Sequence, residues 1–136
     1  MATSIIETIR ETAQARASDA CRQVGSLGAL DYVRQGDVYF WSLDAVPTGC
    51  VEMAKVDWQL APGTTQGSRH IVAAADRASV KLLVLPQPNT LQGPVLDAPH
   101  GVTIEHPEHG HIRLGAGVYL TTFQRAYAEE LRRVQD

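Results

Sequence analysis

The chain has 136 residues, of which 44% are hydrophobic and 20% are charged, and this composition predicts one folded domain and excludes a disordered chain. Twelve lysines and arginines against fifteen aspartates and glutamates give a net charge of −3 without a basic arm, so nucleic-acid binding is not expected. No apolar segment is long enough for a membrane span, and no signal peptide is recognisable. The sequence therefore predicts a soluble cytoplasmic protein in which Cys21 and Cys50 stay reduced.

The first predicted element is an amphipathic helix within residues 1–28. Ser4 and Glu7 form a capping box at its start, and Gly25 and Gly28 provide its C-terminal end. Apolar residues, mostly alanine, recur every three or four positions, so this face is expected to pack on the same domain or on a partner subunit. The predicted interface residues are Ile6, Ile9, Ala13, Ala17 and Ala20.

Residues 29–136 are predicted to form a β-domain that ends in a helix. From residue 29 the apolar pattern changes to the two-residue period of strands, with turn residues at close spacing. The expected strands are 31–34, 37–43, 51–60, 71–75, 80–85, 101–106, 111–114 and 118–123, with a connecting loop at 86–94 and a helix at 126–134. The fold class is thus mainly β, a small barrel or sandwich of about seven or eight strands with a helix at each end.

Four of the five histidines lie close together, at His100, His106, His109 and His111. A hairpin closed by Glu108, His109 and a left-handed Gly110 would pair Glu105 with Arg113. This register puts His106 on the core side of the hairpin and His111 on the opposite side. The imidazoles are therefore expected to point apart, as solvated or hydrogen-bonded groups that need no cofactor.

A metal site is the alternative interpretation of these histidines, because imidazole is a common ligand of zinc and similar divalent ions. It requires the hairpin tip to converge with a histidine from the preceding loop. The predicted ligands are His70, His106, His109 and Glu108.

Two further segments are candidates for binding. Residues 61–70 are rich in glycine and hydroxyl groups, and they form either an ordinary surface loop or an anion-binding loop without the P-loop pattern. The predicted anion-binding residues are Gly63, Thr65, Gly67, Ser68 and Arg69. Tyr39 and Trp41 alternate on one strand face, where they form a partner-binding patch or pack under the N-terminal helix.

From Gln35 onwards the chain resembles small uncharacterised bacterial and phage-encoded β-rich proteins. The resemblance is carried by Gln35-Gly36-Asp37-Val38, the loop 65–70, the segment 106–110, Leu114, Gly117, Tyr119 and Gln124-Arg125. It implies a single β-domain and no known activity, and a phage-encoded origin would place the protein in the host cytoplasm or in a virion.

Two functions are consistent with these patterns. The sequence favours a non-catalytic interaction or assembly module that forms a homo-oligomer or a subunit of a larger assembly. The alternative is a small metal-dependent enzyme of cupin-like kind that uses the histidine-rich hairpin, although the ligand pattern of cupins is absent.

Overall fold

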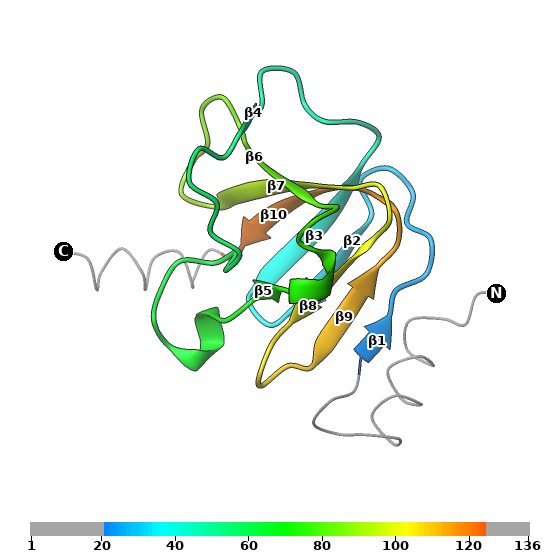
Figure 1. Ribbon diagram of the computed structural model, residues 1–136, viewed down its shortest axis with the longest axis vertical. Coiled ribbons are helices and arrows are strands. Elements are labelled where there is room, and N and C mark those ends of the chain that lie inside the picture. The colour runs from blue at the N-terminus through cyan, green and yellow to red at the C-terminus, as the bar shows by residue number, and fades with distance from the viewer. Residues whose placement is uncertain (1–20, 125–136) are drawn as a thin grey trace.

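The computed structural model describes residues 21–124, which form ten strands and two short 3₁₀ helices (Figure 1). The strands are β1 (Cys21–Gln23), β2 (Tyr32–Gln35), β3 (Val38–Leu43), β4 (Val51–Glu52), β5 (Ile71–Val72), β6 (Lys81–Val84), β7 (Gln92–Ala98), β8 (Val102–Glu105), β9 (His111–Leu114) and β10 (Gly117–Phe123). The 3₁₀ helices are η1 (Gln66–Ser68) and η2 (Ala74–Asp76). The predicted interface residues from Ile6 to Ala20 and the predicted helix at 126–134 lie outside the described residues.

The strands form two sheets in a sandwich-like arrangement. One sheet has the order β1-β9-β8-β5 and the other has the order β2-β3-β10-β7-β6-β4. The mainly β class and the sandwich are confirmed, whereas the barrel is wrong, because neither sheet closes on itself within residues 21–124. The strand count is ten, and the expected seven or eight is too low because short and irregular strands were not recognised.

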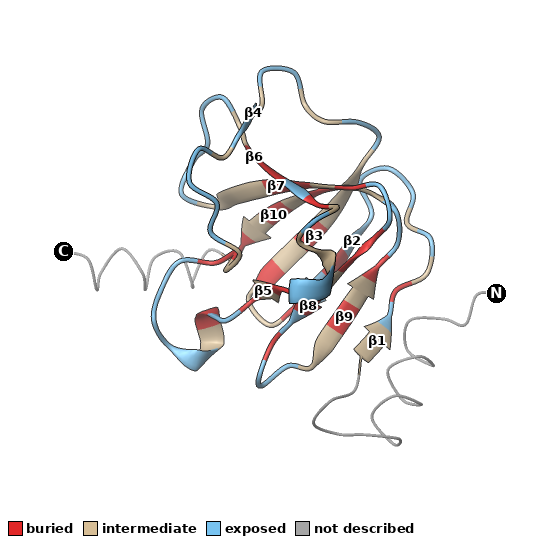
Figure 2. Cartoon of the chain, in the orientation of Figure 1, coloured by how far each residue is buried: buried red, intermediate tan, exposed pale blue. Residues whose placement is uncertain are grey.

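A single hydrophobic core lies between the sheets. Alternate residues are buried along β9, β10 and the first half of β3, as expected for strands with one face towards a core (Figure 2). The core includes Val33, Val38, Phe40, Leu82, Leu96, Val102, Ile104, Ile112, Leu114, Tyr119 and Phe123. The opposite face of β3 and β10 is only partly buried.

The predicted helix within residues 1–28 is wrong for the part that the structure describes. Cys21–Gln23 form β1, which pairs in parallel with β9, and the backbone N–H of Val24 donates to the carbonyl oxygen of Arg113 at 3.0 Å. Extended backbone lets Val24 enter the core and supplies β9 with a hydrogen-bonding partner along its second edge. Residues 21–24 therefore belong to the β-domain, and the expected boundary at residue 28 does not separate them from it.

The predicted loop at residues 86–94 is wrong at its C-terminal end, where β7 begins. β7 lies inside the six-stranded sheet between β10 and β6, although it contains Gly93 and Pro94. The register between β7 and β10 shifts between Leu120 and Thr122, so the proline sits at a bulge. A Cβ atom on Gly93 would come within 2.8 Å of the Phe123 ring, which explains the small residue there.

The predicted strands at 51–60 and 71–75 are much shorter in the structure. β4 ends at Glu52, and beyond it one isolated bridge joins Gln59 to Ile71. The Asp57 carboxylate accepts the backbone N–H of Gln59 at 3.0 Å, a local turn that competes with regular strand pairing. β5 ends at Val72 because η2 begins two residues later.

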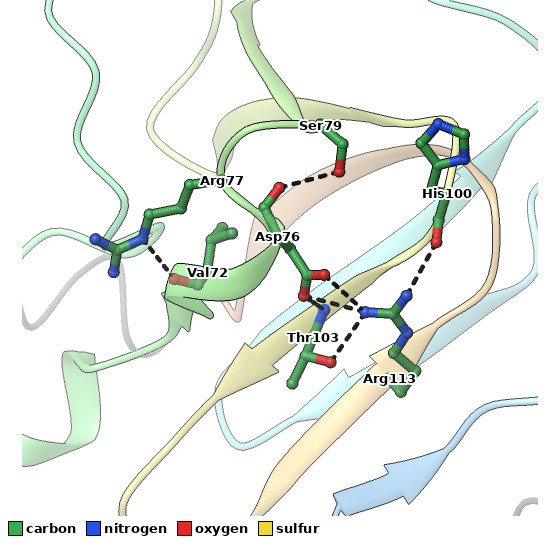
Figure 3. Close-up of polar contacts among 7 residues, drawn as sticks. All are labelled: Val72, Asp76, Arg77, Ser79, His100, Thr103 and Arg113. Atoms are coloured by element: carbon green, nitrogen blue, oxygen red, sulfur yellow. Dashed lines mark hydrogen bonds and ion pairs between the residues drawn. The ribbon is translucent and has the colours of Figure 1, made fainter.

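A polar cluster connects η2 to β8 and β9 (Figure 3). The Arg113 guanidinium donates to both carboxylate oxygens of Asp76, at 3.0 and 3.1 Å, and to the carbonyl oxygen of His100 at 2.9 Å. The same carboxylate accepts the backbone N–H of Thr103 at 2.9 Å.

Cys21 and Cys50 are free thiols. None of the helices in the described part of the chain has the length and apolar character that a membrane span requires.

Candidate functional site

The histidine-rich hairpin has a different register from the predicted one. Ile104 pairs with Ile112 and Thr103 pairs with Arg113, so the predicted pair of Glu105 with Arg113 is wrong by two residues. A shift of two residues keeps every side chain on its face, so His106 is still on the core side. Gly110 has the predicted left-handed conformation, with φ of 79°.

The His106 imidazole holds the hairpin tip together. Its Nδ1 atom accepts the backbone N–H groups of Glu108 and His109, both at 3.0 Å. Nδ1 is therefore unprotonated, and Nε2–H donates to the carbonyl oxygen of Gly67 at 3.1 Å. His106 is 1% exposed, and both of its ring nitrogens are satisfied by the backbone. The His106 side chain therefore bridges the longer connection of the observed register, in place of the three-residue turn of the predicted register.

The His70 imidazole is fully buried and is oriented by Gln35. The amide nitrogen of Gln35 donates to the carbonyl oxygens of Ile104 and Gly110, at 3.0 and 2.8 Å, so the amide oxygen faces His70. His70 Nδ1–H therefore donates to this oxygen at 2.7 Å. His70 Nε2 then carries a lone pair, and it has no hydrogen-bond partner among residues 21–124.

Three imidazoles form a row from the core to the surface. The ring centroids of His70 and His106 are 4.3 Å apart, and those of His106 and His109 are 4.6 Å apart. The hairpin rings of His106 and His109 therefore do not point apart as expected. The loop before β5 adds His70, which was predicted only as a ligand of the alternative metal site. Burial, followed by the neighbouring rings of His106 and His109, lowers the pKa of His70 to about 3. Burial also lowers the pKa of His106, so both inner rings are neutral at neutral pH.

The predicted metal ligands are close together, but they do not all offer free donor atoms. One ligand atom each from His106, Glu108 and His109 lies within 4.8 Å of the others. The lone pair of His106 Nδ1 is already shared by two backbone N–H groups, and a metal ion would have to displace both. The lone pair of His70 Nε2 is enclosed by protein atoms. The arrangement fits a structural network that orders the tip better than a coordination site.

The predicted anion-binding loop uses its backbone N–H groups internally. The N–H groups of Ser68, Arg69 and His70 donate to carbonyl oxygens of the same loop, at 3.1, 3.2 and 2.9 Å. The carbonyl oxygen of Gly63 accepts the Gln59 amide at 2.9 Å, and the Thr65 and Ser68 hydroxyls are 3.3 Å apart. These three N–H groups are therefore not presented to an anion as the sequence pattern suggested.

The outer face of the six-stranded sheet carries an aromatic cluster, defined by Tyr32, Tyr39 and Trp41. The Tyr32 ring centroid lies 5.3 Å from that of Tyr39 and 4.7 Å from that of Trp41. Tyr32 is 50% exposed, and the indole N–H of Trp41 donates to the Thr122 hydroxyl at 2.8 Å. The alternation of Tyr39 and Trp41 predicted this face, but Tyr32 was missed because its partner strand was unknown.

An apolar groove of about 370 Å³ continues from this cluster. Its lining contains no charged residue: Leu30, Trp41, Leu43, Asn89, Leu91, Gln92, Leu120, Thr122 and Phe123. Leu30 is 70% exposed and has a φ of 67°, in the left-handed region that leucine rarely adopts. Nothing in the sequence pattern indicated this strained leucine.

Comparison with known proteins gives a family without an assigned activity. No curated protein and no solved structure matches the chain. Residues 34–124, more than half of the chain, match the model of a family described as a domain of unknown function, DUF8820. The match begins in β2 and ends just after β10, so it spans nearly all of the described sandwich, including the histidine row. The chain belongs to the DUF8820 family.

Proposed function

We propose that this protein is a non-catalytic interaction module that assembles with copies of itself through the aromatic cluster and the adjoining groove. The observation that carries this proposal is Leu30, whose side chain is exposed while its backbone is held in a strained conformation. Left-handed backbone costs a non-glycine residue about 1 kcal/mol in the isolated subunit. Burial of this side chain against another surface would offset that cost.

The chemistry of the surface favours a second copy of the chain as the partner. A two-fold contact pairs the same patch of both subunits, so a charge on the patch would lie close to a like charge on the partner. The groove lining carries no charge, and tyrosine and tryptophan are the residues that most often dominate binding energy at interfaces. A nearby cation, Arg34, has its guanidinium carbon 5.6 Å from the Tyr39 ring centroid.

Light scattering and sedimentation velocity of the full-length protein test the proposal. The wild-type protein is expected to self-associate at micromolar concentrations. Leu30→Asn, which removes apolar area but suits the left-handed backbone, and Tyr32→Asp are expected to weaken association about tenfold or more. Val51→Asp is the matched control, because Val51 is 63% exposed on β4, at the other edge of the same sheet.

Two results would overturn this assignment. A wild-type protein that stays monomeric at about 100 µM has no interface of useful strength. Association that Val51→Asp weakens as much as Tyr32→Asp would place the contact elsewhere. Circular dichroism of each variant shows whether the fold is retained.

The alternative function, a cupin-like metal enzyme, makes an opposite prediction for the hairpin. It requires a stoichiometric divalent metal in protein purified without a histidine tag, and loss of that metal in His109→Ala. The hydrogen bonds that occupy both ring nitrogens of His106 argue against metal coordination at this residue. We therefore expect far less than one metal ion per chain by mass spectrometry.

A further inference from the structure

A small cationic pocket lies beside the end of β2, next to the hairpin tip. Its lining residues are Arg22, Arg34, Gln35, Gly36 and His109, and its volume is about 440 Å³. Gly36 has a φ of 59°, and a Cβ atom there would come within 2.5 Å of the His109 ring. The glycine thus allows the imidazole to lie directly against the turn and form one wall of the pocket.

The two arginines are held by backbone groups, and most of their donors stay available. Arg22 donates one N–H to the carbonyl oxygen of Arg34 at 2.8 Å. Arg34 donates from Nε to the carbonyl oxygen of Gly36 at 2.6 Å and from the terminal nitrogen to the Gln124 amide oxygen at 3.3 Å. A guanidinium has about five N–H donors, so each arginine retains several for a ligand.

The positive charge of the pocket is not neutralised by the described part of the chain. No carboxylate lines the pocket, and the ion pair found within residues 21–124 joins Arg113 to Asp76, neither of which lines the pocket. Burial lowers the pKa of Arg22, which reflects a guanidinium that loses water without gaining a counter-charge. The whole chain carries a net charge of −3, so this pocket is not part of a generally basic surface.

We propose that the pocket binds the phosphate group of a small molecule, with Arg22 and Arg34 as the charged ligands. Two guanidiniums match the double charge of a phosphate, and their planar forks of donors suit its oxygens better than the compact charge of a lysine ammonium would. The volume falls in the range of about 300–1,000 Å³ that is usual for small-molecule sites. The pocket lies outside the predicted anion-binding loop at 63–69 and does not depend on the assembly proposal.

Calorimetric titration of the full-length protein at constant ionic strength tests this site. The probes are inorganic phosphate and glycerol phosphate, because the phosphate group is common to both and a preference between them identifies a free anion or an ester. Arg22→Gln and Arg34→Gln are each expected to weaken binding of the preferred probe at least about tenfold. Lys81→Gln, which removes an exposed cation on β6, is the matched control and is expected to leave binding unchanged.

Arg69→Gln separates this pocket from the loop that the sequence pattern suggested. Binding that is weakened by Arg22→Gln and Arg34→Gln but not by Arg69→Gln supports the pocket. The proposal is overturned if neither probe binds at about 10 mM, or if the two pocket variants bind both probes as the wild type does. It is also overturned if Arg69→Gln has the larger effect. Circular dichroism of each variant excludes loss of binding through unfolding.

Discussion

Acid should unfold this protein through His70. The folded state holds this imidazole neutral, with a pKa of about 3, whereas the same group in the unfolded chain has the ordinary value of 6.5. Between these two values the unfolded state binds one more proton than the folded state, so stability falls as the pH is lowered through this window. A pH of about 4.5 is two units below the pKa of the unfolded imidazole, and this difference corresponds to about 3 kcal/mol of lost stability.

Urea unfolding of the wild type and of His70→Gln, each measured at about pH 7.5 and about pH 4.5, isolates this contribution. Glutamine keeps an N–H donor for Gln35 but does not titrate, so the variant is expected to lose about 3 kcal/mol less on acidification than the wild type. His100→Gln, which removes an exposed imidazole, is the matched control and should lose as much as the wild type. The reasoning fails if His70→Gln and the wild type lose equal stability, or if NMR shows His70 gaining its proton near pH 6.5 in the folded state.

Three further substitutions and one control test the packing around the hairpin by urea unfolding. His106→Ala is expected to destabilise the fold by about 3 kcal/mol, because it leaves two N–H groups and a carbonyl without their partner; a loss below about 1 kcal/mol would contradict the bonded tip. Gly101→Ala should lower the free energy of unfolding by more than about 2 kcal/mol, since its Cβ atom would come within 2.7 Å of the Leu114 carbonyl oxygen at a φ of 83°. Gly115→Ala is the control and should be almost neutral, because a Cβ atom there would have no other atom within 4 Å. Asp76→Asn is expected to cost about 1–2 kcal/mol, because it weakens the contact with a guanidinium and a backbone N–H, and an unchanged midpoint would show that this cluster adds nothing.

Several features of the fold follow from local pattern alone. The two-residue period predicts β3, β8, β9 and β10 within one or two residues, because alternation reports directly which side chains face a core, and a short apolar run predicts β6 equally closely. The left-handed conformation of Gly110 is likewise predicted from its place in a hairpin turn. The candidate site was predicted only as a set of residues. The rings of His70, His106 and His109 lie together in the structure, whereas the favoured prediction had the hairpin histidines pointing apart and only the alternative metal site joined His70 to them.

Other features depend on partners that are distant in the chain. The conformation of β1 is decided by its pairing with β9, and Pro94 is tolerated inside a sheet because it sits at a bulge of β7. The apolar pattern could not fix the register of the β8–β9 hairpin, because a two-residue shift leaves the same apolar side chains buried. The bonds from backbone N–H groups to His106 favour the observed register.

The sequence by itself therefore determined the mainly β class, the core faces of β3, β8, β9 and β10, and the residues able to do chemistry. Only the tertiary structure decided that Gln35 orients His70, that Arg22 and Arg34 line one pocket, and that Leu30 is exposed beside an aromatic cluster. The physical reason is one of range: the alternation of side chains is a property of neighbouring residues, whereas a hydrogen bond or a shared pocket needs segments that meet only when the sheets have formed.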